Sequence, residues 1–105
     1  GSLVYQRRME QSLGVSIDLA PNKAYTSIAF RCSTAKLGES IQPGSSLYGI
    51  ETMVQRPIVL FGGGEPLMCG DYLIGGLGIS GGTVDEDMLI VKAGLRAFQE
   101  CIKGA

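Results

Sequence analysis

The sequence of 105 residues contains no histidine and no tryptophan. Histidine is the usual general base of enzymes, a frequent zinc ligand and the usual proximal ligand of haem iron. Its absence excludes the Ser-His-Asp triad, and it excludes every metal or haem site that depends on an imidazole nitrogen.

An excess of basic residues is also lacking. Nine lysines and arginines stand against ten acidic residues, which gives a net charge of −1. Nucleic-acid-binding domains normally carry a basic face, so this balance argues against such a function. The basic pair Arg7-Arg8 lies on a predicted strand and is interpreted as a solvated face.

Cysteines are few, and their spacing suggests no pairing. Cys32, Cys69 and Cys101 are odd in number and form no C-x-x-C motif. This argues against a disulfide framework and a zinc site, and for a reducing compartment. No apolar run reaches the ~18 residues of a membrane span. We therefore expect a cytoplasmic protein with no metal site and with neither a membrane nor a nucleic acid as partner.

The first part of the chain predicts one strand and two helices. Leu3–Met9 alternates between two faces, as a strand does. Apolar residues then recur at helical spacing up to about Arg31. That helix is predicted to start near Leu19–Pro21, or to be kinked there, because proline lacks the amide N–H. Ser33 is the expected N-cap of a second, short helix over 33–40.

The second part predicts three antiparallel strands. They are Pro57–Phe61, Pro66–Cys69 and Tyr72–Ser80, with Gly70-Asp71 as a two-residue hairpin turn. Glycines within the last strand suggest a bulge or the close approach of another backbone. Together with the helices, this order predicts an α+β domain with a mostly antiparallel sheet.

A final helix gives the clearest signal. Thr83 and Glu86 form the capping box T-x-x-E, and Gly104 stands at the C-terminal cap. Between them, apolar residues recur at alternating steps of four and three, at Val84, Met88, Val91, Leu95, Phe98 and Ile102. This spacing predicts one continuous apolar face packed on the sheet.

The stretch Ile74–Asp87 matches two enzyme motifs. A G-x-G-x-x-G starts at Gly76, but a dinucleotide fold needs a second parallel strand, and the carboxylates at 85–87 would repel a pyrophosphate at the helix start. A G-x-S-x-G centres on Ser80, but the chain has no histidine to activate that serine. A lysine base is an alternative, and nothing in the sequence places one beside Ser80.

Glycine-rich stretches at 62–64 and 75–82 leave two interpretations open. Glycine serves tight turns and close packing, and it also lets a ligand approach the backbone. The stretches therefore have a purely structural role, or they form a two-sided floor for a flat ligand.

Several side chains near these glycines are candidates for ligand contacts. Lys23 could neutralise a ligand carboxylate, although a solvated lysine is the simpler interpretation, and the same holds for Arg56. Glu65 could act as an acid or base, or be solvated. Soft sulfur donors for a metal or haem iron, which more often fill cores, are Met53, Met68 and Cys69.

Four stretches together resemble a known family. In order they are "DLAPNKAYTSIAF", "LGESIQPGSSLYGIE", "RPIVLFGGGEPL" and "IGGLGISGGTVDED". This set resembles the family of GlcG, the haem-binding protein HbpS and the C-terminal domain of PduO, often called the haem-degrading domain family. The resemblance implies a profilin-like α+β fold that assembles into dimers or larger oligomers. Its members are linked to haem binding, to glycolate use and to cobalamin-dependent propanediol or glycerol metabolism.

The chain departs from this family in two respects. The resemblance implies that 3–105 is a single domain without the family's N-terminal helix and first strand, so its exposed sheet edge would need covering by a second chain or segment. Members that ligate haem through histidine are no guide, because any iron ligand here must be Met, Cys, Tyr or a hydroxyl.

We therefore expect a small accessory protein that forms a homo-oligomer and binds haem, a corrinoid or another small acid. Alternatives are an enzyme acting on haem or a small metabolite, and an assembly partner in a metabolic complex. The sequence identifies no catalytic residue. The predicted ligand contacts are Lys23, Phe61, Gly62, Gly63, Gly64, Glu65, Gly78, Ser80 and Gly81.

Overall fold

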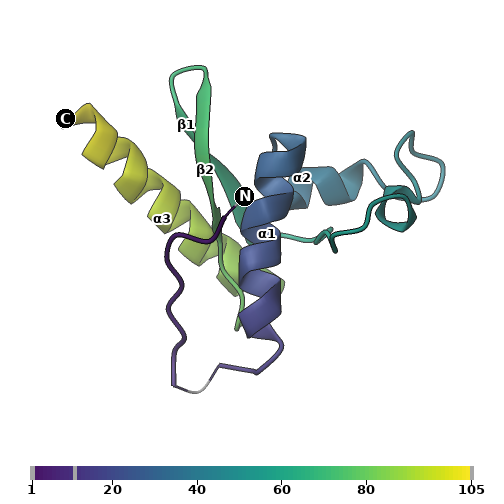
Figure 1. The fold of residues 1–105 in the computed structure, drawn as a ribbon, viewed down its shortest axis with the longest axis horizontal. Helices are drawn as coiled ribbons and strands as arrows, with labels where there is room; N and C mark the ends of the chain where they lie inside the picture. The colour runs from purple at the N-terminus through teal and green to yellow at the C-terminus, as the bar shows by residue number, and fades with distance from the viewer. Residues whose placement is uncertain (1, 11, 105) are drawn as a thin grey trace.

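A computed structural model of the chain describes residues 2–10 and 12–104. Its elements, in chain order (Figure 1), are α1 (Ser16–Phe30), α2 (Thr34–Glu39), a short 3-10 helix η1 (Ile50–Thr52), β1 (Gly64–Cys69), β2 (Tyr72–Gly78) and α3 (Val84–Lys103). Within the described residues, every helix is too short or too polar to span a bilayer. The helices and the antiparallel strand pair confirm the α+β class.

The two strands form the hairpin that the sequence predicted. β1 and β2 pair antiparallel from Gly64↔Gly78 onward, and Gly70 in the turn has a φ of 61°, which favours glycine. The partner of Leu67 is Gly75 and the partner of the next residue is Leu73, so Ile74 is left over as a bulge. The bulge expected in the last strand is confirmed.

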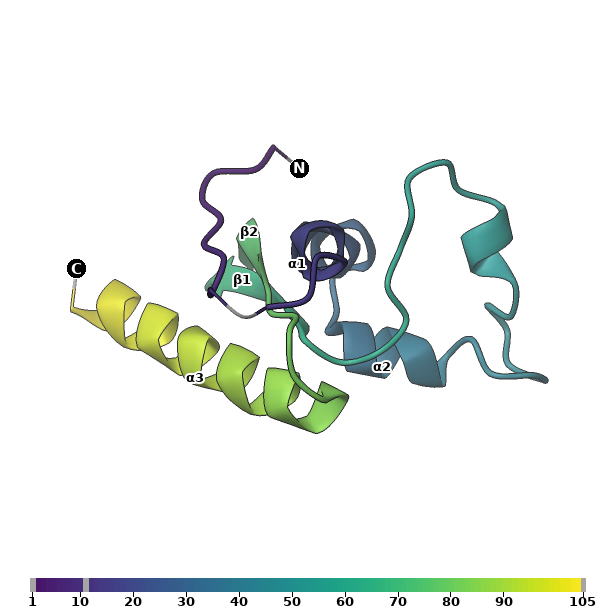
Figure 2. The same ribbon diagram turned by 90° about the horizontal axis from the view of Figure 1, so that it is seen from below.

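Two helices enclose the hairpin on opposite faces, as Figure 2 shows. A Cβ on Gly76 would lie 2.6 Å from the carbonyl oxygen of Ala24 in α1. A Cβ on Gly94 in α3 would lie 2.7 Å from Leu77 Cδ2. Because neighbouring strand residues point to opposite faces, α1 covers one side of β2 and α3 covers the other. Gly76 and Gly78 of β2 thus serve the close approach of α1.

The final helix begins and ends as predicted. The Thr83 hydroxyl accepts a hydrogen bond from the Glu86 amide at 3.1 Å, and the Glu86 carboxylate accepts one from the Thr83 amide at 2.9 Å. Val91, in the middle of the apolar face, is 1% exposed. The capping box, the Gly104 cap and the packed face are all confirmed.

Helix α1 begins earlier than the sequence suggested. It starts at Ser16, so Pro21 lies inside it, in its second turn. A proline there leaves the carbonyl four residues back without a donor. That carbonyl belongs to Ile17, and it accepts a hydrogen bond from Gln6 Nε2 at 3.0 Å. An external donor therefore allows the helix to extend back past the proline.

Two predicted strands are wrong. Residues 3–9 are extended but belong to no ladder, and Pro57–Phe61 is irregular. The amide of Val59 donates instead to the Thr26 hydroxyl at 3.0 Å, so α1 takes up the donor that a ladder would use. Alternation of apolar residues does not make a strand unless a second backbone lies within hydrogen-bonding reach.

Candidate functional site

Lys23 is buried rather than solvated, so the simpler interpretation of this residue was wrong. Its side chain is 0% exposed. Its Nζ lies 3.1 Å from Asp87 Oδ2 and donates to the Ile79 carbonyl at 2.7 Å. The other oxygen of Asp87 accepts from the Gly82 amide at 3.0 Å. This buried ion pair connects α1 to the start of α3. The Lys23 ammonium therefore has its partners inside the protein.

The glycine triplet packs around this lysine. A Cβ on Gly63 would lie 2.5 Å from Lys23 Nζ, and one on Gly64 would lie 2.5 Å from the Lys23 carbonyl oxygen. Gly78 faces the Ala20 carbonyl of α1 in the same way. The space that these glycines leave free is therefore taken up by the chain's own atoms, which gives them a structural role in this arrangement.

The other predicted contacts lie at separate places. Glu65 is half-buried, and burial raises the pKa of its carboxyl, with Lys92 nearby opposing the shift. The Ser80 hydroxyl bonds to the Ser16 hydroxyl at 3.2 Å, near the start of α1, and Gly81 beside it is exposed. The structure brings Lys23, Phe61 and the glycine triplet together. Glu65, Ser80 and Gly81 lie outside that cluster.

Phe61 is the accessible part of the cluster. The residue is 43% exposed, and the centroid of its ring lies 5.1 Å from Lys23 Nζ. A Cβ on the neighbouring Gly62 would lie 2.5 Å from Met88 Sδ and 3.3 Å from Val84 Cγ1. We call Phe61, Gly62, Val84 and Met88 the Phe61 patch. Sequence reasoning missed Val84 and Met88 because their spacing assigned both to the apolar face of α3.

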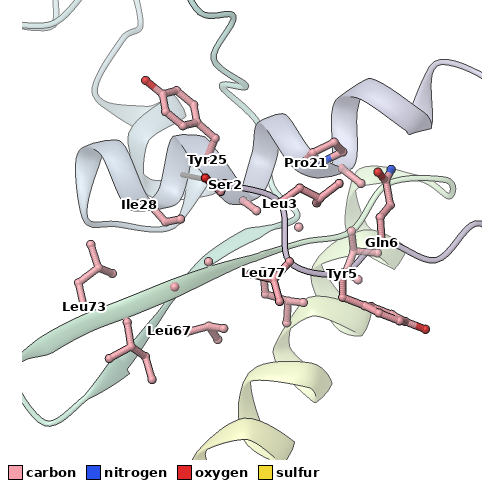
Figure 3. A pocket seen from close by; sticks show the side chains of 18 of the residues that line it. Ser2, Leu3, Tyr5, Gln6, Pro21, Tyr25, Ile28, Leu67, Leu73 and Leu77 are labelled. Carbon is pink, nitrogen blue, oxygen red and sulfur yellow. The ribbon is translucent and has the colours of Figure 1, made fainter.

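A groove of about 760 Å³ lies between α1, β2 and the extended segment 2–7 (Figure 3). Its volume is within the ~300–1,000 Å³ typical of ligand sites. Most of the lining side chains are apolar, and its charged lining residues are Arg7 and Arg56. The guanidinium of Arg56 lies 3.8 Å from the ring centroid of Tyr25. The groove was not predicted from the sequence, because its outer wall is a segment that was expected to pair as a strand.

Comparison with known proteins gives a consistent result. The family model described as haem degrading protein HbpS-like matches residues 1–96. An uncharacterised 15.0 kDa protein of Citrobacter freundii, from the dhaT-dhaS intergenic region, is 40% identical over 100 residues, which are 95% of this chain and 70% of that protein. The corrinoid adenosyltransferase PduO of Salmonella typhimurium is 48% identical over 91 residues, but these make up 27% of its length.

Solved structures agree with this assignment. A chain from a PduOC–haem complex has 46% identity and a TM-score of 0.86, with 90% of this chain and 68% of that chain covered. The Klebsiella pneumoniae protein ORFY has 36% identity and a TM-score of 0.83, with 89% and 64% covered. With the family model matching 1–96 of 105 residues, the chain belongs to the HbpS-like family of haem degrading proteins.

Proposed function

We propose that this chain is a haem-binding accessory domain with no catalytic activity of its own. The observation that carries the proposal is the likeness to the PduOC chain solved with haem, at 46% identity over 90% of this chain. The match to PduO covers 27% of that enzyme, so its adenosyltransferase activity is not part of the proposal. The domain would act in the cytoplasm and would be linked to cobalamin-dependent, glycolate or glycerol metabolism.

The Phe61 patch has the chemistry that a haem site needs. A sequence without histidine must offer iron a sulfur or oxygen donor. Met88 places a thioether beside Gly62, and the exposed Phe61 ring offers an aromatic face. A flat apolar macrocycle would stack on that ring, while the Met88 side chain fills the space beside Gly62. When bound, haem would supply a redox-active iron.

Lys23 has a different role in this proposal from the one expected of it. Its ammonium is paired with Asp87, so it does not serve as a partner for a propionate. Instead its position 5.1 Å from the ring centroid stabilises the orientation of Phe61 through a cation–π contact. We therefore treat Lys23 as a positioning residue below the patch.

A hemin titration of the purified protein tests the proposal, with the Soret band as readout. We expect a shifted band with the parent chain. Phe61→Leu should weaken binding roughly three- to tenfold through loss of ring stacking, and Met88→Leu should change the band position because the sulfur donor is gone. Met9→Leu is the matched control, since Met9 is 66% exposed and outside the patch. An unshifted band with the parent protein would refute haem binding.

The same titration separates the alternatives. A parallel titration uses cobalamin in place of hemin and follows tyrosine fluorescence. Protection of the tyrosine fluorescence by cobalamin would favour a corrinoid ligand. Bleaching of the Soret band with a reductant and oxygen, only when the protein is present, would favour an enzyme acting on haem.

We also propose that the chain forms a homo-oligomer. The segment between α2 and β1 projects from the rest of the molecule (Figure 2). It exposes large apolar residues, namely Leu47, Tyr48, Met53 and Val54. Exposed apolar groups of this kind are typical of interaction surfaces. Light scattering should give a mass of two or more times the 11.1 kDa of one chain. A monomer at micromolar concentration would refute the oligomer.

A further inference from the structure

The carboxylate of Glu65 lies on the face of the hairpin that α3 covers. Gly64, the residue before it, faces α1, because a Cβ there would lie 2.5 Å from the Lys23 carbonyl oxygen. Neighbouring strand residues point to opposite faces, so Glu65 points toward α3. Its ladder partner Leu77 does the same, since a Cβ on Gly94 of α3 would lie 2.7 Å from Leu77 Cδ2. Glu65 is thus half-buried between β1 and α3.

Lys92 is the cation that lies near this carboxylate. Residues four apart on a helix lie on the same side, about 6 Å apart along the axis. Val84 and Met88 both lie beside Gly62, and Lys92 continues their row by one more turn of α3. Attraction to Lys92 opposes the rise in the Glu65 carboxyl pKa that burial causes. Since Lys92 is itself exposed, the row ends in an ammonium that a ligand can reach.

The Phe61 patch therefore has two unlike ends. Where α3 begins, Asp85 and Glu86 are exposed and acidic. At the other end stands the exposed Lys92. The ammonium of Lys23, below the patch, already has a carboxylate partner inside the protein. An apolar ligand with an anionic edge would be repelled at the first end and attracted at the second.

We propose that Lys92 binds a carboxylate of the ligand at the Phe61 patch, and that Glu65 competes with the ligand for this ammonium. Such a contact rests on the proposed haem binding and deepens it, because it gives the ligand an orientation. Haem carries both propionates on one edge, and that edge would lie at Lys92 with the apolar edge toward Val84. A few well-placed polar groups commonly fix orientation and specificity in an apolar site. The patch would therefore prefer tetrapyrroles with free carboxylates over uncharged ones.

Glu65 determines how strongly Lys92 attracts an anion. An ionised carboxyl beside the ammonium lowers the positive potential at this end of the patch. Because Glu65 is half-buried between a strand and a helix, its charge is screened less than that of an exposed carboxylate. A neutral glutamine at this position should leave the full charge of Lys92 available to the ligand.

The test uses metal-free protoporphyrin IX, which keeps both propionates but has no iron for a sulfur donor. Its fluorescence gives the Kd for each variant of the full chain. Lys92→Gln should weaken binding roughly two- to fivefold, the range expected of an exposed ion pair, and Lys92→Arg should retain the parent affinity. Lys103→Gln is the matched control, because it removes an exposed lysine of α3 about 16 Å farther along the helix.

A second set of measurements tests the competition. Glu65→Gln should tighten protoporphyrin binding by roughly two- to fivefold, and this gain should disappear when Lys92→Gln is added to it. The dimethyl ester of protoporphyrin has no carboxylate charge, so the parent chain and all these variants should bind it equally. Unchanged protoporphyrin binding by Glu65→Gln would overturn the competition.

Parallel hemin titrations keep the two proposals apart. If Lys92→Gln selectively weakens protoporphyrin while the hemin Soret band stays unshifted, the carboxylate contact is supported and haem binding is refuted. If the hemin band shifts but the parent and Lys92→Gln bind protoporphyrin equally, the contact is overturned and haem binding stands. Equal losses in Lys92→Gln and Lys103→Gln, or no binding of protoporphyrin to the parent chain, would also overturn the contact.

Discussion

The side-chain amide of Gln6 donates to the carbonyl oxygen of Ile17 at 3.0 Å, four residues before Pro21. This bond supplies the donor that the proline ring cannot give. It also ties the extended segment 2–7 to α1, which fixes the outer wall of the groove. One hydrogen bond thus connects the position of Pro21 inside α1 to the shape of the groove.

Replacement of Gln6 by leucine should destabilise the fold by about 0.5–1.5 kcal/mol, since the Ile17 carbonyl loses its partner. In a Pro21→Ala background, the amide of residue 21 can itself donate to that carbonyl. There the cost of Gln6→Leu should fall toward zero. Urea unfolding of the parent, both single variants and the double variant gives the coupling energy. Equal costs in both backgrounds would show that the two residues act independently.

The buried Lys23–Asp87 pair should be costly to break. Lys23→Met leaves the Asp87 carboxylate buried without its cation, and removal of one partner of such a pair costs about 3–5 kcal/mol. The double variant Lys23→Met, Asp87→Leu removes both charges and should be more stable than the single variant. Chemical denaturation measures both. Lys36→Met, an exposed lysine on α2, is the matched control and should change stability little.

A loss below about 1 kcal/mol for Lys23→Met would contradict a buried charge at Asp87. If that variant does not fold, soluble expression of the double variant still tests the pair, because it should be recovered.

These residues show what the sequence could and could not predict. The capping box at Thr83 and the hairpin turn at Gly70 depend on neighbours within a few residues, and both were predicted correctly. The burial of Lys23 depends on Asp87, 64 positions away, and no local pattern reports such a distance. For the same reason the sequence could not show that residues 3–9 would lack a second backbone to pair with.

In the candidate site, too, features set by near neighbours could be predicted and features set by distant residues could not. The glycine stretches were predicted to have a structural role or to form a floor for a ligand, and which atoms approach them depends on the tertiary structure. Gly63 faces the Lys23 ammonium, and Gly78 faces α1. A glycine pattern therefore predicts the presence of a tight contact and not its chemistry.

Gly63→Ala should be more damaging than Gly44→Ala. Both glycines have a positive φ, 125° and 90°, so alanine is strained at each. Only at Gly63 does the new methyl group meet other atoms, with Lys23 Nζ at 2.5 Å and the Ile79 carbonyl oxygen at 2.6 Å, while nothing lies within 4 Å at Gly44. Overpacking should add about 1–3 kcal/mol to the loss at Gly63. Thermal unfolding of the two variants checks this, and equal losses would mean that the backbone around Lys23 can yield.

The capping box should make stability depend on pH in the acidic range. Hydrogen bonds from the Thr83 amide and hydroxyl lower the pKa of the Glu86 carboxyl below its ordinary value of 4.5. Because the folded pKa is the lower one, the stabilisation is fully present above the unfolded pKa. It is lost as the pH falls through the folded pKa. Glu86→Gln should therefore reduce stability at pH 7 and flatten the stability profile below about pH 4.5.

Glu100→Gln removes an exposed carboxylate outside the box and serves as control. Unfolding midpoints in urea from pH 2 to pH 7 give the profiles, and parallel profiles for the parent and Glu86→Gln would show that the carboxylate does not stabilise the start of α3.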